Sequence, residues 1–222
     1  GFPPTAYYLI SSIASFLSIV LPFSFFLFFG KRKLSDTVLV EKNGVLNSVL
    51  LVFAGLAVSV LMNIPANLIS QLLEGAGLNG DANTADLLAM TPVQALTMFV
   101  SVVLVAPVTE EFAFRSVTTA VMRRWGDWPA VIFSALIFGM AHYSIQSLPV
   151  VLMAGFVMAL LYVRTRNIWV NIFVHMLNNL LATLPIALEG LVGADAANIA
   201  SNLLTYIVYG LGLVALVVLL IR

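Results

Sequence analysis

The stretch QALTMFVSVVLVAPVTEEFAFR, residues 94–115, decides the fold. It begins with a run that carries no charge, Ala95–Pro107, and then places Glu110, Glu111 and Arg115 within six residues. A transmembrane helix needs ~20 largely apolar residues, and this run supplies most of one. Each ionisable side chain within such a helix costs at least ~2.5–3.5 kcal/mol on insertion scales, so intramembrane charges mark function by default.

The composition of the whole chain agrees with a membrane protein. Hydrophobic residues make up 61% of the 222 residues and charged residues 9%, and the mean hydropathy is +1.06. Soluble domains have roughly 25% charged residues. We therefore expect an all-α, polytopic membrane helix bundle that forms a single domain over residues 1–222. The absence of cysteine excludes disulfides and thiolate sites, and the zero net charge argues against a nucleic-acid partner.

Hydropathy predicts about seven transmembrane helices. Their expected ranges are 6–29, 46–72, 93–124, 129–145, 148–164, 168–188 and 199–221. The first is too long for the core of a signal peptide, so we expect a membrane helix rather than a cleaved leader. The third is long, and we expect a kink at Pro107, because proline removes the bond to the carbonyl of Val103.

The loop charges predict the orientation. With seven helices, every Lys and Arg except Arg115 falls on the side of the C-terminus, whereas loops 73–92 and 189–198 carry only acidic charges, at Glu74, Asp81, Asp86, Glu189 and Asp195. The positive-inside rule then places the N-terminus outside and the C-terminus in the cytoplasm, and we expect the protein in the cell (plasma) membrane.

Helical spacing separates the two glutamates. Glu111 and Arg115 are four residues apart and can form an ion pair. Glu110 lies ~100° away around the helix and has no local counter-charge, which suits it to general acid or base work. His175 and Asn179 share another helical face, with Asn171 one turn earlier.

Glu110 and His142 are each about 16 residues from the Gly126–Asp127 turn, so at 1.5 Å per residue they reach similar depths and can face each other. His175 matches this level less well. Glu111–Arg115 could be a structural pair, and a lone His or Asn could join helices by hydrogen bonds. The complete set favours a functional site over purely structural roles.

Three motifs carry a resemblance to a known family. EEFAFR (Glu110–Arg115), FGMAH (Phe138–His142) and HMLNN (His175–Asn179) follow one another within apolar segments. They resemble the EExxxR, FxxxH and HxxxN motifs of the CPBP family. That family comprises the type II CAAX prenyl endopeptidases and related bacteriocin-processing or immunity proteins. The motif-bearing core, about 93–188, covers under half of the chain.

The resemblance implies an intramembrane endopeptidase that hydrolyses a peptide bond of a membrane-anchored peptide or protein, lipidated or not. By motif position, Glu110 is the general base, and His142 helps to hold or deprotonate the water. His175 and Asn179 donate hydrogen bonds to the oxyanion, a role worth about 3–4 kcal/mol per donor. Glu111 and Arg115 are supporting residues that orient the others.

Several alternatives stay open at this stage. Two His and two Glu could ligate zinc, through Glu110, His142 and His175, but there is no HExxH motif and we favour water activation without a metal cofactor. A non-catalytic immunity or scaffold protein of the same family is the main rival, and a proton-coupled transporter ranks last, because no inverted repeat is visible. The phenylalanines near the motifs could line a lipid groove or simply pack; they are Phe112, Phe114, Phe138 and Phe173.

Overall fold

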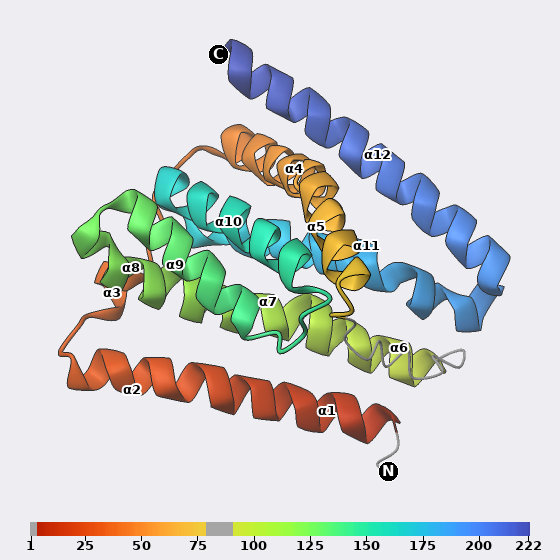
Figure 1. The fold of residues 1–222 in the computed structure, drawn as a ribbon, viewed down its shortest axis with the longest axis horizontal. Helices are drawn as coiled ribbons and strands as arrows, with labels where there is room; N and C mark the ends of the chain where they lie inside the picture. Colours follow the sequence, from red (N-terminus) through yellow and green to blue (C-terminus); the bar gives the residue numbers. More distant parts are fainter. Residues whose placement is uncertain (1–3, 79–90) are drawn as a thin grey trace.

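The structure, a computed structural model, describes residues 4–78 and 91–222. Within these residues the chain is a bundle of helices with no β-strand (Figure 1). The predicted all-α polytopic fold is therefore confirmed. Two residues of the predicted acidic loop, Asp81 and Asp86, lie outside the described residues.

Helices occur at all seven predicted positions. The first position holds α1 (Pro4–Ser15), a π-helical segment (Phe16–Val20) and α2 (Leu21–Phe29). The second holds α4 (Val45–Leu61) and α5 (Asn63–Gly75), and the short α3 (Leu34–Thr37) lies between α2 and α4. The third holds α6 (Pro92–Met98), α7 (Ala106–Glu110), α8 (Thr119–Met122) and the segments that join them. The last four are α9 (Asp127–Met140), α10 (Leu148–Thr165), α11 (Ile168–Val192) and α12 (Ala194–Ile221).

Six of these segments, among the described residues, are long and apolar enough to cross a membrane. The exception is α9, whose 14 residues span only ~21 Å against a hydrocarbon core of ~30 Å. The predicted helix 129–145 therefore ends early. In Figure 1 the connection from α9 to α10 stops well short of the far ends of α6 and α11. His142 lies in this connection, directly after the end of α9.

The third segment is continuous from Pro92 to Trp125 over 34 residues, or ~51 Å, which exceeds the bilayer core. The irregularity expected near Pro107 is present as a change in hydrogen bonding. Phe99–Val105, just before the proline, and Glu111–Thr118, just after Glu110, are π-helical. Such wide turns are rare and are frequent at functional sites. A hydroxyl from α9 compensates for one of them, because Ser134 Oγ donates to the carbonyl of Phe114 at 2.8 Å.

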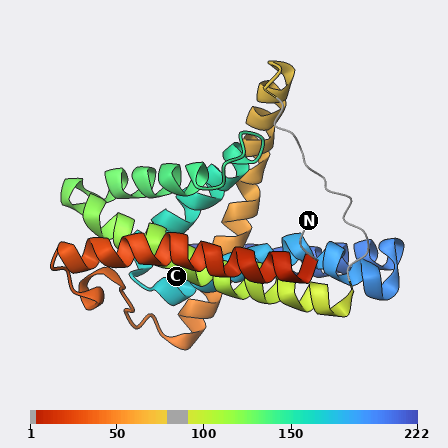
Figure 2. The ribbon, with the colours of Figure 1, turned by 90° about the horizontal axis from the view of Figure 1, so that it is seen from below.

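The arrangement of the ends matches the predicted separation of charges. The connection from α2 to α4, the turn before α9, the turn before α11 and the C-terminus all lie toward the left of Figure 1. Contacts tie this end together: Arg166 Nε pairs with the carboxylate of Glu41, and Arg222 Nη1 donates to Asn47 Oδ1 at 3.0 Å. The opposite end carries the turn between α11 and α12. Figure 2 shows that α4 and α5 cross the long helices steeply.

Close packing fixes the helices around the motifs. Phe114, Phe138, Met158 and Val174 belong to one buried core cluster contributed by four segments of the chain. A Cβ atom at Gly155 would lie 2.9 Å from Phe138 Cδ1, so this glycine lets α10 approach the ring of Phe138 closely. The phenylalanine of the second motif is thereby held at the centre of the bundle.

Candidate active site

The first motif supplies a buried carboxylate with three partners. Glu111 is fully buried, and its Oε2 lies 3.2 Å from Nε of the equally buried Arg115. The same oxygen accepts a bond from Asn171 Nδ2 at 3.4 Å, and Oε1 lies 2.9 Å from His175 Nδ1. The predicted Glu111–Arg115 pair is present, and two side chains of α11 complete its environment.

Arg115 is held by charge and by an aromatic ring more than by hydrogen bonds. Its Nη1 and Nη2 have no hydrogen-bond partner within residues 4–78 and 91–222. Its guanidinium carbon lies 4.1 Å from the centre of the Phe138 ring. A desolvated cation over an aromatic face gains on the order of 2 kcal/mol, which offsets part of the cost of burial.

Glu110 has a different environment although it is the adjacent residue. Its side chain is 17% exposed, and its one ion contact among the described residues is with His175 Nε2, at 3.7 Å from Oε2. His175 therefore lies between the two glutamates, with one ring nitrogen directed to each. The sequence predicts that His175 matches the depth of Glu110 and His142 less well, yet its side chain contacts both glutamates of the first motif.

His142 lies at the exposed edge of this group. Its Nδ1 is 2.9 Å from the carbonyl oxygen of Phe138. Because a carbonyl only accepts, Nδ1 carries a proton, and the Nε2 of a neutral ring then has a free lone pair. The ring of Phe138 contacts both imidazoles, with centroid distances of 4.8 Å to His142 and 5.8 Å to His175. No hydrogen bond joins Glu110 to His142 within the described parts of the chain.

Asn179 lies one turn beyond His175, as the spacing predicts, but its amide is already engaged. Its Nδ2 donates to the carbonyl of Val102 at 2.9 Å. That carbonyl belongs to the π-helical segment before Pro107, where the regular helical bonding is interrupted. An oxyanion role for Asn179 would require this bond to be exchanged for one to the substrate.

The candidate metal ligands do not form a metal-binding group. Nowhere in the described ranges do three His, Asp or Glu side chains gather closely enough to hold one ion. Both ring nitrogens of His175 point to carboxylates, at 2.9 Å for Nδ1 and 3.7 Å for Nε2. A catalytic zinc needs three protein ligands and an open position, and Glu110, His142 and His175 do not fit that requirement as they are placed.

Asn171 is the residue whose role the sequence left unassigned. It is fully buried, and its Nδ2 donates both to Glu111 Oε2 and to the carbonyl of Met158 at 2.5 Å. In the sequence, its position one turn before His175 was the feature that could have indicated this role.

The phenylalanines near the motifs differ in their settings. Phe114 and Phe138 pack in the buried core and stack edge to face at 5.4 Å.

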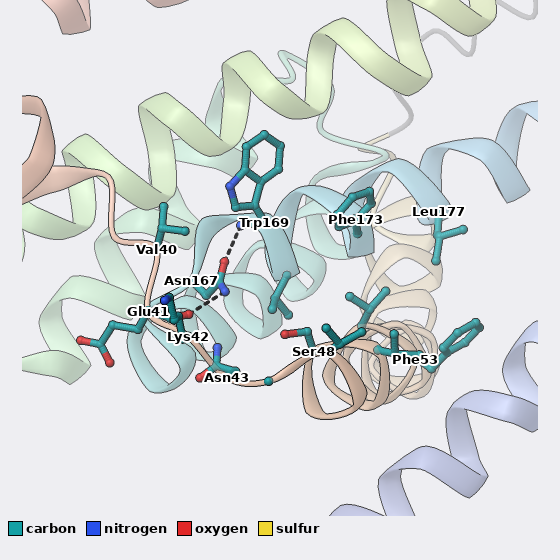
Figure 3. Close-up of a pocket in the computed structure, with 15 residues that line it drawn as sticks. Val40, Glu41, Lys42, Asn43, Ser48, Phe53, Asn167, Trp169, Phe173 and Leu177 are labelled. Carbon is teal, nitrogen blue, oxygen red and sulfur yellow. Dashed lines mark hydrogen bonds between the residues drawn. The ribbon is translucent and has the colours of Figure 1, made fainter.

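Phe173 instead lines a groove of about 680 Å³ between α4 and α11. Figure 3 shows apolar side chains along most of this groove and polar ones, including Lys42 and Asn43, at one end. Trp169, Phe173 and Leu177 of α11 face it, whereas Asn171 and His175 face the glutamates. One helix thus separates the groove from the candidate active site.

A known family model matches the part of the chain that carries all three motifs. Residues 92–181 match a family model described as "Type II CAAX prenyl endopeptidase Rce1-like". A Bacillus subtilis (strain 168) protein named "Putative membrane peptidase YdiL" is 31% identical over 140 residues, which cover 63% of this chain and 57% of that protein. The chain thus spans little more than half of that relative's length. No solved structure matches the chain.

Proposed function

We propose that this chain, whose resemblance to the CPBP family is confirmed by the match over residues 92–181, is an intramembrane endopeptidase. It would hydrolyse a peptide bond of a membrane-anchored peptide or protein, whether or not that substrate is lipidated. The observation that carries the proposal is the contrast between the two glutamates. Glu111 is sealed among three partners, while Glu110 is partly exposed beside His175.

Glu110 is proposed as the general base. Its carboxylate would take a proton from a water molecule, and the resulting hydroxide would attack the carbonyl carbon of the scissile bond. The Nε2 lone pair of His142 can hold that water, because its Nδ1 is bonded to the Phe138 carbonyl. His142 is exposed, and we propose that water reaches the site along this edge. Base assistance of this kind contributes on the order of 10²–10⁴-fold.

His175 is proposed to stabilise the oxyanion of the tetrahedral intermediate. The neutral ring with its proton on Nδ1 donates to Glu111 and can only accept at Nε2. The imidazolium form donates from both nitrogens, so the oxyanion role requires a protonated His175. The carboxylate of Glu111 would stabilise that positive charge, because its Oε1 lies 2.9 Å from His175 Nδ1. Arg115 and Asn171 in turn hold Glu111 in place. Asn179 would supply a second donor after release from Val102.

The membrane setting is part of the proposal. The end of the bundle that carries nine of the ten basic residues would face the cytoplasm of a cell membrane, with the N-terminus outside. Because α9 is too short to span, the number of crossings depends on how deeply the α9–α10 hairpin enters. Cysteine labelling from either side of the membrane, at positions such as Ser35 in α3 and Gln146 in the α9–α10 connection, tests this placement.

Activity tests need a substrate, and a trap identifies one. We expect membrane peptides to accumulate in cells that express Glu110→Ala in place of the wild-type protein. Purified Glu110→Ala and His142→Ala should cleave such a peptide at least 100-fold more slowly, with thermal midpoints close to that of the wild type. If both variants keep full biological activity, the protein acts as a scaffold or immunity factor. The proposal also expects hydrolysis without a metal cofactor, so activity should survive exhaustive chelation.

A further inference from the structure

A second polar cavity lies at the basic end of the molecule, away from the glutamates. It has a volume of about 310 Å³ and is bounded by the segment around α3, by α8 with the turn that follows it, and by the end of α10. Ligand sites typically occupy ~300–1,000 Å³. Its charged lining residues are Arg32, Arg123 and Arg166, opposed by the single carboxylate of Asp36. We call this cavity the arginine pocket.

The three guanidiniums retain donors for a ligand. Among the described residues, Arg123 and Arg166 make ion contacts through Nε alone, toward Asp127 at 2.9 Å and toward Glu41. Arg32 has no ion pair within the described residues. A guanidinium has five N–H donors in a planar fork that matches the oxygens of a phosphate. The lining carries three positive charges and one negative charge, and Asp127 and Glu41 pair with two of the arginines from outside the lining.

The pocket is built on backbone that is held firmly. Tyr162 Oη donates to the carbonyl of Thr37 at 2.8 Å and accepts from the amide of Leu39 at 3.1 Å. Two backbone hydrogen bonds join the residues before α4 to those between α10 and α11. Glu41 N donates to Arg166 O, and Ile168 N donates to Leu39 O, each at 2.9 Å. Arg166 therefore projects from backbone that is tied to the segment before α4.

Arg166 gives an independent indication. Its φ is 49°, in the left-handed region. This position ends α10, where glycine or asparagine is usual, and a non-glycine residue there carries backbone strain. Strained residues of this kind cluster at ligand sites. An arginine at this position is accounted for if its side chain has a role that glycine cannot fill.

The depth of the pocket suits the headgroup layer of a membrane. Trp125 and Trp128, two and five residues after Arg123, are 55% and 57% exposed. Tryptophan is enriched at membrane interfaces, and basic pockets between helices at the cytoplasmic face suit anionic headgroups. The pocket thus combines cationic forks with an interfacial position.

We propose that the arginine pocket is a binding site for a phosphate group, supplied by the headgroup of an anionic phospholipid or by free phosphate. The site is separate from the proposed peptidase chemistry, because its residues make none of the contacts of Glu110, Glu111 or His175. Its occupancy would fix the end of α10 against α8 and so anchor the bundle in the anionic leaflet.

Thermal unfolding of the full chain in an uncharged detergent tests this site. The ligands are dioctanoyl phosphatidylglycerol, dioctanoylglycerol, which lacks the phosphate, and inorganic phosphate. We expect the phosphatidylglycerol to raise the thermal midpoint in a saturable way and the dioctanoylglycerol to leave it unchanged. Inorganic phosphate acting at the same concentration would assign the site to free phosphate; inorganic phosphate without effect would assign it to the lipid. Equal shifts with both dioctanoyl compounds, or no saturable shift with either phosphate source, would overturn the proposal.

Neighbouring arginines supply the matched variants. Arg123→Gln and Arg32→Gln should each weaken phosphate binding about tenfold or more, because each removes a charge-assisted fork. Arg124→Gln is the control for the first, since Arg124 stacks on Trp125 with its guanidinium carbon 3.8 Å from the ring centre and does not line the pocket. Lys33→Gln is the control for the second. Arg32→Gln breaks no described ion pair, so it separates loss of binding from loss of stability. Equal weakening by the variants and their controls would refute a specific site.

Discussion

Glu110 and Glu111 are neighbours in the chain, yet the structure places them in opposite settings. Glu111 has no exposed surface and contacts Arg115, Asn171 and His175. Glu110 has a 17% exposed side chain and, in the part of the chain that the structure describes, one ion contact, with His175 at 3.7 Å. A buried carboxylate with several hydrogen-bond and ion-pair partners orients other groups, whereas a partly exposed carboxylate with few partners is available to a substrate. The difference assigns support to one glutamate and chemistry to the other.

The largest effect on stability should come from breaking the buried ion pair between Glu111 and Arg115. Arg115→Met removes the cation and leaves the Glu111 carboxylate buried without its counter-charge. Removing one partner of a buried pair costs about 3–5 kcal/mol. Thermal or denaturant unfolding in detergent measures it. Arg123→Met provides the control, because its pair with Asp127 is exposed and should cost under ~1 kcal/mol. Similar small losses for both would mean that the buried pair is not structural.

A second substitution should restore part of that loss. Glu111→Gln combined with Arg115→Met removes both charges and keeps an acceptor oxygen for His175. We expect the double variant to be more stable than Arg115→Met alone, with a coupling energy of ~0.5–3 kcal/mol. A double-mutant cycle of unfolding free energies measures this coupling. Strictly additive losses would show that Glu111 and Arg115 do not act as a pair.

Substitution of Asn171, which also contacts Glu111, should lower the stability less than loss of Arg115. Asn171→Leu keeps the side-chain volume but removes the donor to Glu111 and to the Met158 carbonyl. A hydrogen bond to a charged group contributes about 1.5–3 kcal/mol. The unfolding free energy should fall by that amount. Asn178→Leu on the same helix, for which no bond to Glu111 is present, is the control and should change stability less.

Asn179 should show the smallest effect on stability and thereby test its proposed role. Asn179→Leu removes the bond to the Val102 carbonyl, which contributes ~0.5–1.5 kcal/mol. If Asn179 also donates to the oxyanion, peptide cleavage should fall about 10²–10³-fold, far more than the stability loss explains. Cleavage reduced only in proportion to the folded fraction would restrict Asn179 to a structural role.

The sequence predicted the fold more completely than the site. Hydropathy located all seven helices, because apolar length is the strongest signal that a membrane imposes. It extended α9 too far, since Ile145 continues the apolar count, although the polar residues Ser144, Gln146 and Ser147 already indicated a turn. The π-helical segments gave no signal, because they depend on tertiary contacts such as the Ser134–Phe114 bond.

Within the site, local spacing was sufficient for the pair that lies on one helix. Glu111 and Arg115 are four residues apart, and the structure joins them at 3.2 Å. The position of His175 between two glutamates could not be read from spacing, because it depends on how α11 packs against the π-helical turn. The same holds for Phe138, which contacts Arg115 and both histidines. Partners on different helices require the three-dimensional packing.

The most direct test of the division between the glutamates compares Glu110→Gln with Glu111→Gln in one preparation. Both substitutions are isosteric, and each variant is assayed for peptide cleavage and for its thermal midpoint. We predict that Glu110→Gln loses at least 100-fold in cleavage with an unchanged midpoint, while Glu111→Gln lowers the midpoint because Arg115 loses its counter-charge. A stable Glu111→Gln that loses all cleavage, together with a fully active Glu110→Gln, would contradict the account.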